Sequence, residues 1–502
     1  MPRQSSSRVV LSLRPLTEGI VRVRSDLEMP LGAAAHIENL IYMPDGSLRT
    51  FLGGRYFGKI NLDGPVLLLD EYVKDDETSE LLALSPQTLY KYNPTSEEWE
   101  EVATGYNFSV DYPPWSTIVD NKWVFGSRNQ PVRYYDGTVV QDFITVMPPG
   151  ITTLYATTGL YLNGRLFLGN TVENDEWIGY RLRYSSLIDP QDFEAPGSGF
   201  IDFRMSPYPI VDLRPLGEYL VVYKKRGVYF GRQTGNIDFP YSFALVDDTA
   251  GPLSSRVVTS RLREQWWIGW NDFYTLNTSG LAVISGKIGK DPIRQISATA
   301  DRTAWGKLSE KYSMIVFWLP EGTNTYPQRA WVWHYGLNSW TTLKLNLPAE
   351  LTCGGYVKRR EQSPLPSDLI GVSNGWVIEW SEDETDWLGK GIEWIWQSGE
   401  IIVPHPVTKA VSDFVLLEIR VLLTPLRRLV TLETEISIDR GETWEATQRM
   451  KIWKEFESAK LYVAHFFKRT YSFSFRIRGR GPCYIRDITI VASVASEAWT
   501  ND

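Results

Sequence analysis

Short apolar segments separated by turn residues run along nearly the whole chain. Residues 219–223 (Tyr-Leu-Val-Val-Tyr) and 228–231 (Val-Tyr-Phe-Gly) flank a Lys-Lys-Arg-Gly segment. Segments rich in aromatic and β-branched residues, ending at Gly, Asn, Asp or Pro, predict strands and hairpins. Gly227 supplies the positive φ that a tight hairpin turn requires. No long run has apolar residues at helical spacing, so the pattern predicts an all-β protein.

The same unit, an apolar strand followed by a turn and an aromatic strand, recurs along the chain. The units lie at 81–99, 123–137, 160–185, 219–231, 266–276, 314–340 and 369–380. Their spacing of roughly 40 residues is the period of propeller blades, which bury their faces only against neighbouring blades. We therefore predict a β-propeller of about seven blades over residues 51–390. A set of ordinary β-sandwiches with similar hairpins is the alternative.

The pattern changes after residue 390. Residues 432–438, 471–478 and 484–490 largely alternate apolar and polar side chains, and 415–423 is a further apolar strand. Alternation is typical of strands with one solvated face. Residues 391–502 are predicted to form a C-terminal antiparallel β-sandwich or barrel. Residues 1–50 are predicted to form an N-terminal arm or to contribute a strand to one of the β domains.

The composition narrows the classes of function. The 502 residues carry a net charge of −8, whereas a general nucleic-acid binder carries a basic excess. Aromatic residues make up 13% of the chain, which suits both strands and protein interfaces. Cys353 and Cys483 are far apart and predict buried, reduced thiols. The first residues are polar and no apolar run has the length of a membrane helix, so neither a signal peptide nor a membrane-spanning segment is expected.

One motif matches the Asp-box pattern S-x-D-x-G-x-T-W. Its fixed positions are Ser437, Asp439, Gly441, Thr443 and Trp444. In such a hairpin turn the aspartate accepts backbone N–H groups, the glycine takes a left-handed conformation and the tryptophan packs beneath. Sialidases carry several such boxes, but this chain has one, outside the predicted propeller. We interpret it as a structural turn with a buried indole.

Residues that would carry catalysis are not assembled in the sequence. No pair among the four histidines, His36, His334, His405 and His465, has metal-ligand spacing, and no nucleophile or phosphate-binding motif occurs. Acidic pairs such as Asp247 and Asp248 resemble glycosidase carboxylates but are typical of solvated turns. We expect no catalytic residue, no metal and no cofactor, and we do not expect an enzyme.

Arg476, Arg478 and Arg480 recur at a period of two and so share one face of a predicted strand. Such a row can bind an acidic partner or DNA phosphate. An ion-paired or solvated face is the other interpretation.

Several segments resemble one protein family. They are residues 183–193 (RYSSLIDPQDF), 199–203 (GFIDF), 209–229, the early 30–34 (PLGAA), and Asp439 to Trp444. Together they resemble the tail nozzle, or packaged-DNA stabilisation, proteins of short-tailed (podovirus-type) bacteriophages. The D-G-G turn of that family is Asp439-Arg440-Gly441 here, which is a departure from the pattern.

The resemblance implies a structural virion protein of the phage tail, assembled in the host cytoplasm. It implies a homohexameric ring below the portal and adaptor rings, forming the distal part of the DNA-ejection channel. The implied partners are the portal and adaptor, a tailspike or tail fibre, a tail needle or plug, and genome DNA passing without sequence-specific binding. The alternatives are a propeller scaffold that binds proteins or glycans, and a propeller carbohydrate hydrolase.

Overall fold

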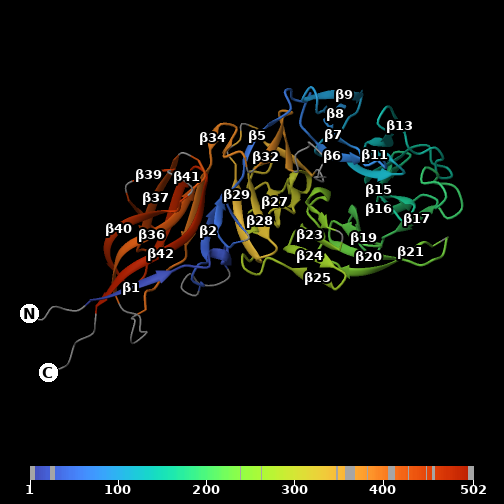
Figure 1. Ribbon diagram of the computed structural model, residues 1–502. Helices are drawn as coiled ribbons and strands as arrows, with labels where there is room; N and C mark the ends of the chain where they lie inside the picture. The colour runs from blue at the N-terminus through green and yellow to red at the C-terminus, as the bar shows by residue number, and fades with distance from the viewer. Residues whose placement is uncertain are drawn as a thin grey trace, which may run out of the picture.

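The computed structural model of the chain describes residues 6–22, 29–43, 45–237, 239–261, 263–345, 347, 349–356, 368–381, 383–404, 413–427, 429–447, 449–454 and 458–495 (Figure 1). Within these residues the chain is almost entirely β-structure, as predicted. Its few helices are single turns, namely α1 (Asp291–Arg294), α2 (Ala300–Thr303), η1 (Leu16–Glu18) and η3 (Ser255–Val257).

Seven antiparallel blades of four strands each account for most of the described strands and confirm the predicted β-propeller (Figure 1, right). Blades 1 to 3 contain β6 (Leu68–Val73), β7 (Ser79–Leu84), β8 (Thr88–Asn93), β9 (Glu98–Thr104); β10 (Trp115–Val119), β11 (Lys122–Ser127), β12 (Gln130–Tyr135), β13 (Val140–Asp142); and β14 (Leu154–Leu162), β15 (Arg165–Glu173), β16 (Glu176–Tyr184), β17 (Gly199–Asp202). Blades 4 to 6 contain β18 (Ile210–Leu216), β19 (Tyr219–Lys224), β20 (Gly227–Gln233), β21 (Tyr241–Asp247); β22 (Thr259–Arg261), β23 (Glu264–Ile268), β24 (Phe273–Asn277), β25 (Gly280–Val283); and β26 (Trp305–Ser309), β27 (Met314–Leu319), β28 (Arg329–His334), β29 (Ser339–Lys344).

Blade 7 closes the ring with a strand from the other end of the propeller chain. It contains β30 (Leu351–Tyr356), β31 (Asp368–Val372), β32 (Val377–Ser381) and, as its outer strand, β5 (Gly53–Phe57). The register runs from Val377 opposite Phe57 to Ser381 opposite Gly53. A small hairpin, β33 (Asp386–Trp387) and β34 (Lys390–Gly391), extends this blade. At this joint the first strands of blades 7 and 1, β30 and β6, lie against one another, so the ring is continuous across it.

The second unit is a sandwich of two sheets (Figure 1, left). One sheet contains β1 (Ser6–Ser12), β3 (Leu40–Tyr42), β4 (Leu48–Thr50), β36 (Phe414–Pro425), β40 (Lys460–Thr470) and β42 (Cys483–Ala495). The other contains β2 (Ala34–Glu38), β35 (Glu393–Ser398), β37 (Leu429–Ser437), β38 (Glu445–Ala446), β39 (Met450–Trp453) and β41 (Ser474–Arg480). Strands β1 to β4 therefore lie in the sandwich, although they are followed in the chain by the propeller.

The two units share a sheet and a core. The second sheet of the sandwich continues into blade 6, because β2 pairs with both β35 and β29. Asn39, at the end of β2, has a φ of 58° and donates its side-chain amide to the carbonyl oxygens of Lys344 (3.0 Å) and Glu393 (2.8 Å). Trp340 of blade 6 and Trp394 of the sandwich belong to one buried cluster. The propeller and the sandwich are thus packed as one body at this junction.

Tryptophan fills much of this core. The largest fully buried side chains among the described residues include nine tryptophans, in the propeller (Trp123, Trp266, Trp267, Trp305, Trp318, Trp331, Trp340) and in the sandwich (Trp394, Trp396). Burying indoles of this size contributes strongly to core packing. Much of the aromatic surplus is explained by the core, and only part of it is left for partner surfaces.

Candidate functional site at the propeller–sandwich junction

The Asp-box turn follows β37 and has the hydrogen bonds expected of a structural hairpin. Ser437 donates its hydroxyl to Asp439 (2.6 Å) and accepts the N–H of Gly441 (2.7 Å), and the N–H of Thr443 donates to Asp439 (3.0 Å). Gly441 has a φ of 88°. Hydrogen bonds from Ser437 and Thr443 lower the pKa of Asp439 to about 2. The hydrogen bonds that the Asp439 carboxylate accepts therefore stabilise the turn.

Trp444 differs from the sequence expectation because its ring is half-exposed rather than buried. Its indole N–H donates to the carbonyl oxygen of Gly441 (3.1 Å), and the guanidinium of Arg476 lies 4.1 Å from the ring centroid. The ring packs beneath an arginine rather than beneath the core, which is a cation–π contact.

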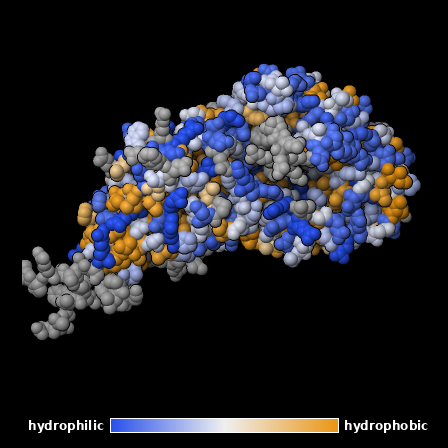
Figure 2. Space-filling view, in the orientation of Figure 1, coloured by the Kyte–Doolittle hydropathy of each residue, from blue (hydrophilic) through white to orange (hydrophobic). Residues whose placement is uncertain are grey.

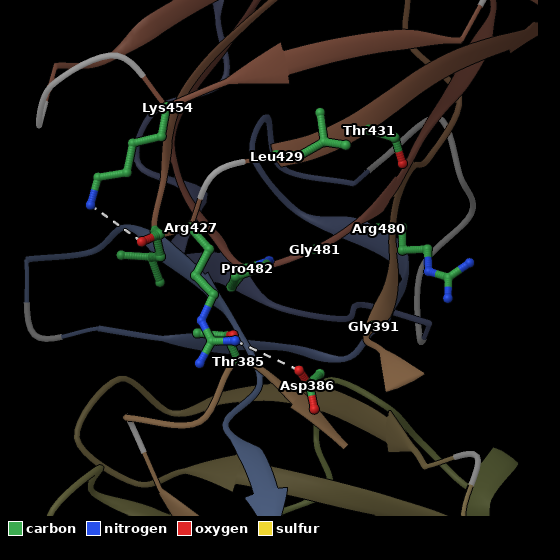
Figure 3. A pocket seen from close by; sticks show the side chains of 11 residues that line it. Thr385, Asp386, Gly391, Arg427, Leu429, Thr431, Lys454, Arg480, Gly481 and Pro482 are labelled. Atoms are coloured by element: carbon green, nitrogen blue, oxygen red, sulfur yellow. Dashed lines mark hydrogen bonds and ion pairs between the residues drawn. The ribbon is translucent and has the colours of Figure 1, made fainter. Parts of the chain in front are cut away.

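The three arginines of β41 have different surroundings. Arg476 and Arg478 both form ion pairs with Glu435 on the neighbouring strand β37, the second at 3.0 Å. For these two residues the ion-paired interpretation fits the geometry. Arg480, at the end of β41, is exposed and lines a pocket at the junction with blade 7 (Figure 3). The row of three therefore contributes one cation to a candidate site.

This pocket, the junction groove, has a volume of about 720 Å³ and lies where the sandwich meets the hairpin of β33 and β34. Figure 3 shows that Arg427, from the loop after β36, and Lys454, just after β39, stand at its sides with Arg480. Arg427 is 3.7 Å from the carboxylate of Asp386, and Lys454 donates to the carbonyl oxygen of Leu426 (3.3 Å). Among the described residues that line the groove, Asp386 is the one carboxylate beside three cations, so this described lining carries a net positive charge.

Apolar side chains line the same groove between the cations. Leu426 and Leu429 are half-exposed and Pro482 is buried. A second cavity of about 710 Å³ shares Gly391 and Arg480 with the groove, but it contains three glutamates, Glu38, Glu350 and Glu393, beside two lysines, Lys344 and Lys390. The positive excess is therefore confined to the first cavity. Cations around an apolar floor suit a ligand that carries both acidic and apolar groups.

Sequence reasoning missed Arg427 and Lys454. They are 27 residues apart in the chain and 26 or more from Arg480, and neither stands in a motif. The turn between β41 and β42 and the loop after β36 bring them together, which only the pairing of the strands determines.

The buried ionisable groups hold the fold. Burial raises the pKa of Asp70, yet its carboxylate accepts hydrogen bonds from Ser116 (2.5 Å) and Trp123 (2.8 Å) of blade 2. Burial also lowers the pKa of His334 to about 3, so this ring is neutral, and it contacts Thr341 at 3.3 Å. In the part of the chain that the structure describes, no group of three or more His, Cys, Asp or Glu residues could hold a metal ion.

A second candidate surface is the loop between β16 and β17. Ser185 and Ser186 are fully buried, and buried Arg165 donates to the carbonyl oxygens of Ser185 (2.6 Å) and Gly197 (2.5 Å). The next two side chains, Leu187 and Ile188, are 51% and 89% exposed. We call these two residues the blade 3 tip. An apolar tip on a hydrogen-bonded base is a feature of docking surfaces.

Comparisons with known proteins find similar solved structures but no related sequence. No family model matches it, and no curated protein matches it. Similar solved structures include YCF48 from Cyanidioschyzon merolae (9% identity, TM-score 0.39, covering 66% of this chain and 99% of that one) and the Pan2 WD40 domain from Neurospora crassa (9% identity, TM-score 0.40, covering 68% and 97%). YCF48 bound to D1 peptide has 11% identity and a TM-score of 0.40, covering 68% and 97%. These similarities are too low to carry an argument about function.

None of the helices among the described residues is long and apolar enough to cross a membrane.

Proposed function

We propose that this chain is a non-catalytic β-propeller scaffold that holds other proteins in an assembly, and that the assembly is the tail of a short-tailed phage. The observation that carries the proposal is the blade 3 tip. Burying Leu187 and Ile188 against a partner removes apolar surface from water, at roughly 1.5–3 kcal/mol for Ile188 and about half of that for Leu187, which is already half-buried. Because the base of the loop is already ordered, little conformational entropy is lost on binding.

The base of this loop is held by several independent contacts. Ser186 donates its hydroxyl to the carbonyl oxygen of Asp189 and accepts the N–H of the same residue, both at 3.0 Å. The N–H of Phe193, a buried side chain, donates to the carbonyl oxygen of Val146 (3.0 Å). These contacts hold the base of the loop beneath the exposed tip.

The opposite end of the molecule also exposes apolar side chains. On the sandwich, Leu461 and Phe467 of β40 are 58% and 70% exposed, and Tyr471 follows them. Figure 2 shows hydrophobic surface at both ends of the long axis, over the sandwich and over the far blades. A protein that joins two neighbours needs two such ends.

The tail nozzle is the specific assembly that we propose. The loop with the exposed tip is residues 183–193, the segment that most resembles the nozzle and packaged-DNA stabilisation family. In that role six copies form a ring below the portal and adaptor, hold the packaged DNA and attach other tail components. The net charge of −8 supports a channel that does not retain DNA phosphates.

The test is negative-stain imaging of the purified protein, alone and mixed with the portal–adaptor complex of a short-tailed phage. Six-fold rings that dock end-on to the adaptor support the nozzle. Monomers that do not bind the adaptor would contradict the nozzle proposal and favour a protein-binding scaffold outside the phage tail.

Variants of the tip test the scaffold itself. Ile188→Asp should abolish assembly with its partner and leave the melting curve unchanged. Ile60→Asp, at an exposed isoleucine between β5 and β6, is the matched control and should assemble normally. Equal behaviour of the two variants would remove the tip from the proposal.

A further inference from the structure

We propose that the junction groove binds an acidic peptide segment, and that this segment is residues 496–502 of a neighbouring copy of the chain. The inference rests on the proposed assembly function, because it supplies a contact by which copies join.

The charge of the groove favours an acidic occupant. Three cations, Arg427, Lys454 and Arg480, face one carboxylate, Asp386. Among the described residues no carboxylate lies within ion-pair distance of Lys454 or Arg480, and the side chain of Arg427 is 53% exposed. A bound carboxylate would form a charge-assisted hydrogen bond with Lys454 and with Arg480, neither of which has a carboxylate partner among the described residues.

The side chain of Arg480 packs closely against Gly391. A Cβ atom built there would lie 3.0 Å from Nε of Arg480. Arg480 lies beside Gly391 and lines the groove on the side opposite Arg427 and Lys454 (Figure 3).

The apolar floor favours a peptide over a nucleic acid. Leu426 and Leu429 leave apolar surface open between the cations, and the volume of about 720 Å³ accommodates an aromatic side chain together with its backbone. A phosphate backbone needs a track of cations and gains nothing from leucine. The occupant should carry a large apolar side chain flanked by carboxylates.

Residues 496–502 of this chain have that chemistry. Their sequence is Ser-Glu-Ala-Trp-Thr-Asn-Asp, in which Trp499 stands between Glu497 and Asp502. In an extended peptide, with about 3.3 Å per residue, the two carboxylates lie roughly 7 and 10 Å from the tryptophan on either side. The indole can then reach the leucines while both carboxylates reach cations at the sides of the groove.

The segment cannot reach the groove of its own chain. The groove contains Gly481 and Pro482, just before β42, whereas the segment follows Ala495 at the other end of that 13-residue strand. The strand spans roughly 43 Å, and seven extended residues span at most about 25 Å. The donor is therefore a second copy, in a head-to-tail contact. Repeated contacts of this kind close into a ring when the rotation between copies permits.

The experiment measures fluorescence anisotropy of a labelled peptide with the sequence of residues 493–502. It is titrated with the chain ending at Ala495, which leaves the groove free. The Arg427→Ala/Lys454→Ala/Arg480→Ala variant should bind at least about tenfold more weakly. The control variant Arg226→Ala/Arg232→Ala/Lys311→Ala removes three exposed cations elsewhere and should bind as the parent does.

Changes in the peptide test the same contact from the other side. Trp499→Ala, and Glu497→Gln with Asp502→Asn, should each weaken binding by about tenfold or more. Equal affinity of the groove and control variants, with unchanged melting curves, would overturn the inference. So would a labelled single-stranded DNA oligonucleotide that binds the groove when the peptide does not.

Sedimentation velocity of the full chain separates this inference from the proposed function. Removal of residues 496–502 should shift assemblies toward monomer. A ring that forms without the segment overturns the inference and leaves the nozzle intact. If the chain forms no ring but binds the peptide in the groove, the result supports the peptide site and contradicts the nozzle proposal.

Discussion

The propeller and the sandwich are built from similar strands, but they are connected in opposite ways. In blades 1 to 6 each strand pairs with the next in sequence, so every blade is local. In the sandwich, β1 pairs with β42 and β2 with β35, which are hundreds of residues apart. In the propeller the two chain regions meet at one strand, β5, whereas in the sandwich three N-terminal strands, β1, β2 and β4, pair with strands of the C-terminal region. Stability should therefore be distributed differently in the two regions.

The largest effect should come from removing β5, which completes blade 7 of the propeller, together with β1 to β4, which belong to the sandwich. Deletion of residues 1–57 removes β1 to β5, and we expect loss of the folded state of both units, measured by circular dichroism and by recovery of soluble protein. Deletion of residues 1–12 removes only the edge strand β1 and should leave the propeller folded. A folded chain after the larger deletion would contradict the strand pairings described above.

Equal truncations in the two regions sharpen the comparison. Trp394→Ala in the sandwich and Trp318→Ala in blade 6 each remove a fully buried indole and should each cost about 3–5 kcal/mol of unfolding free energy. Hydrogen exchange should show the loss in β2, β35 and β41 for the first variant, and in β26 to β28 for the second. Identical exchange patterns would mean that the two units unfold together.

Blade 3 offers a pH-dependent test within the propeller. Buried Glu173 bonds Arg183 at 2.7 Å and Arg181 at 3.0 Å. Burial alone would raise the pKa of Glu173. The hydrogen bonds and charges of the two arginines outweigh this effect, so the pKa in the folded protein lies below the ordinary value of 4.5. The stabilisation is present above 4.5 and is lost as the pH falls through the folded pKa.

Glu173→Gln should cost about 3 kcal/mol at pH 7, because buried Arg183 loses its carboxylate partner and Arg181 keeps only Asp202. It should also reduce the loss of stability between pH 5 and pH 3, measured from urea midpoints. An unchanged pH profile in the variant would contradict the assigned shift. Glu98→Gln, at an exposed residue of β9, is the control.

At the propeller–sandwich junction, a single polar side chain, Asn39, should make a large contribution to the unfolding free energy. Asn39→Ala removes three part-buried side-chain hydrogen bonds, to the carbonyl oxygens of Lys344 and Glu393 and from the N–H of Lys344. It also places alanine at a positive φ, so we expect a loss of about 2–3 kcal/mol. Asn39→Gly relieves the backbone strain and isolates the hydrogen-bond contribution. Thermal unfolding of the two variants gives the difference.

The smallest effect is expected at the Asp-box. Because Trp444 is half-exposed, Trp444→Ala should cost only about 1 kcal/mol, less than the 3–5 kcal/mol that a buried indole contributes. A loss of several kcal/mol in thermal unfolding would restore a core role for this ring.

The same contrast decides what the sequence could predict. The hairpin predicted at 219–231 forms β19 and β20. The sequence period predicted the propeller correctly because most blades consist of strands that are consecutive in the chain. The pairing of β1, β2 and β4 with strands more than 300 residues later has no local signal. In the candidate site, the alternation of side chains along a strand identified Arg480, but it also predicted that Arg476 and Arg478 could bind a partner equally well. Glu435, on another strand, neutralises those two, and only the register between β37 and β41 reveals it. Arg427 and Lys454 come from loops, where no period exists.

The placement of β1 to β5 also sets an order of events during synthesis. These strands leave the ribosome first, yet their partners β32, β35 and β42 follow some 320 to 480 residues later. At the usual 5–20 residues per second, the early strands wait for roughly 20–90 seconds. Blades 1 to 6 can form during that time, while the early strands expose unpaired edges that invite association with other chains. The chain should therefore depend on chaperones most strongly while its second half is still being made, and variants that slow translation late in the chain should aggregate more than those that slow it early.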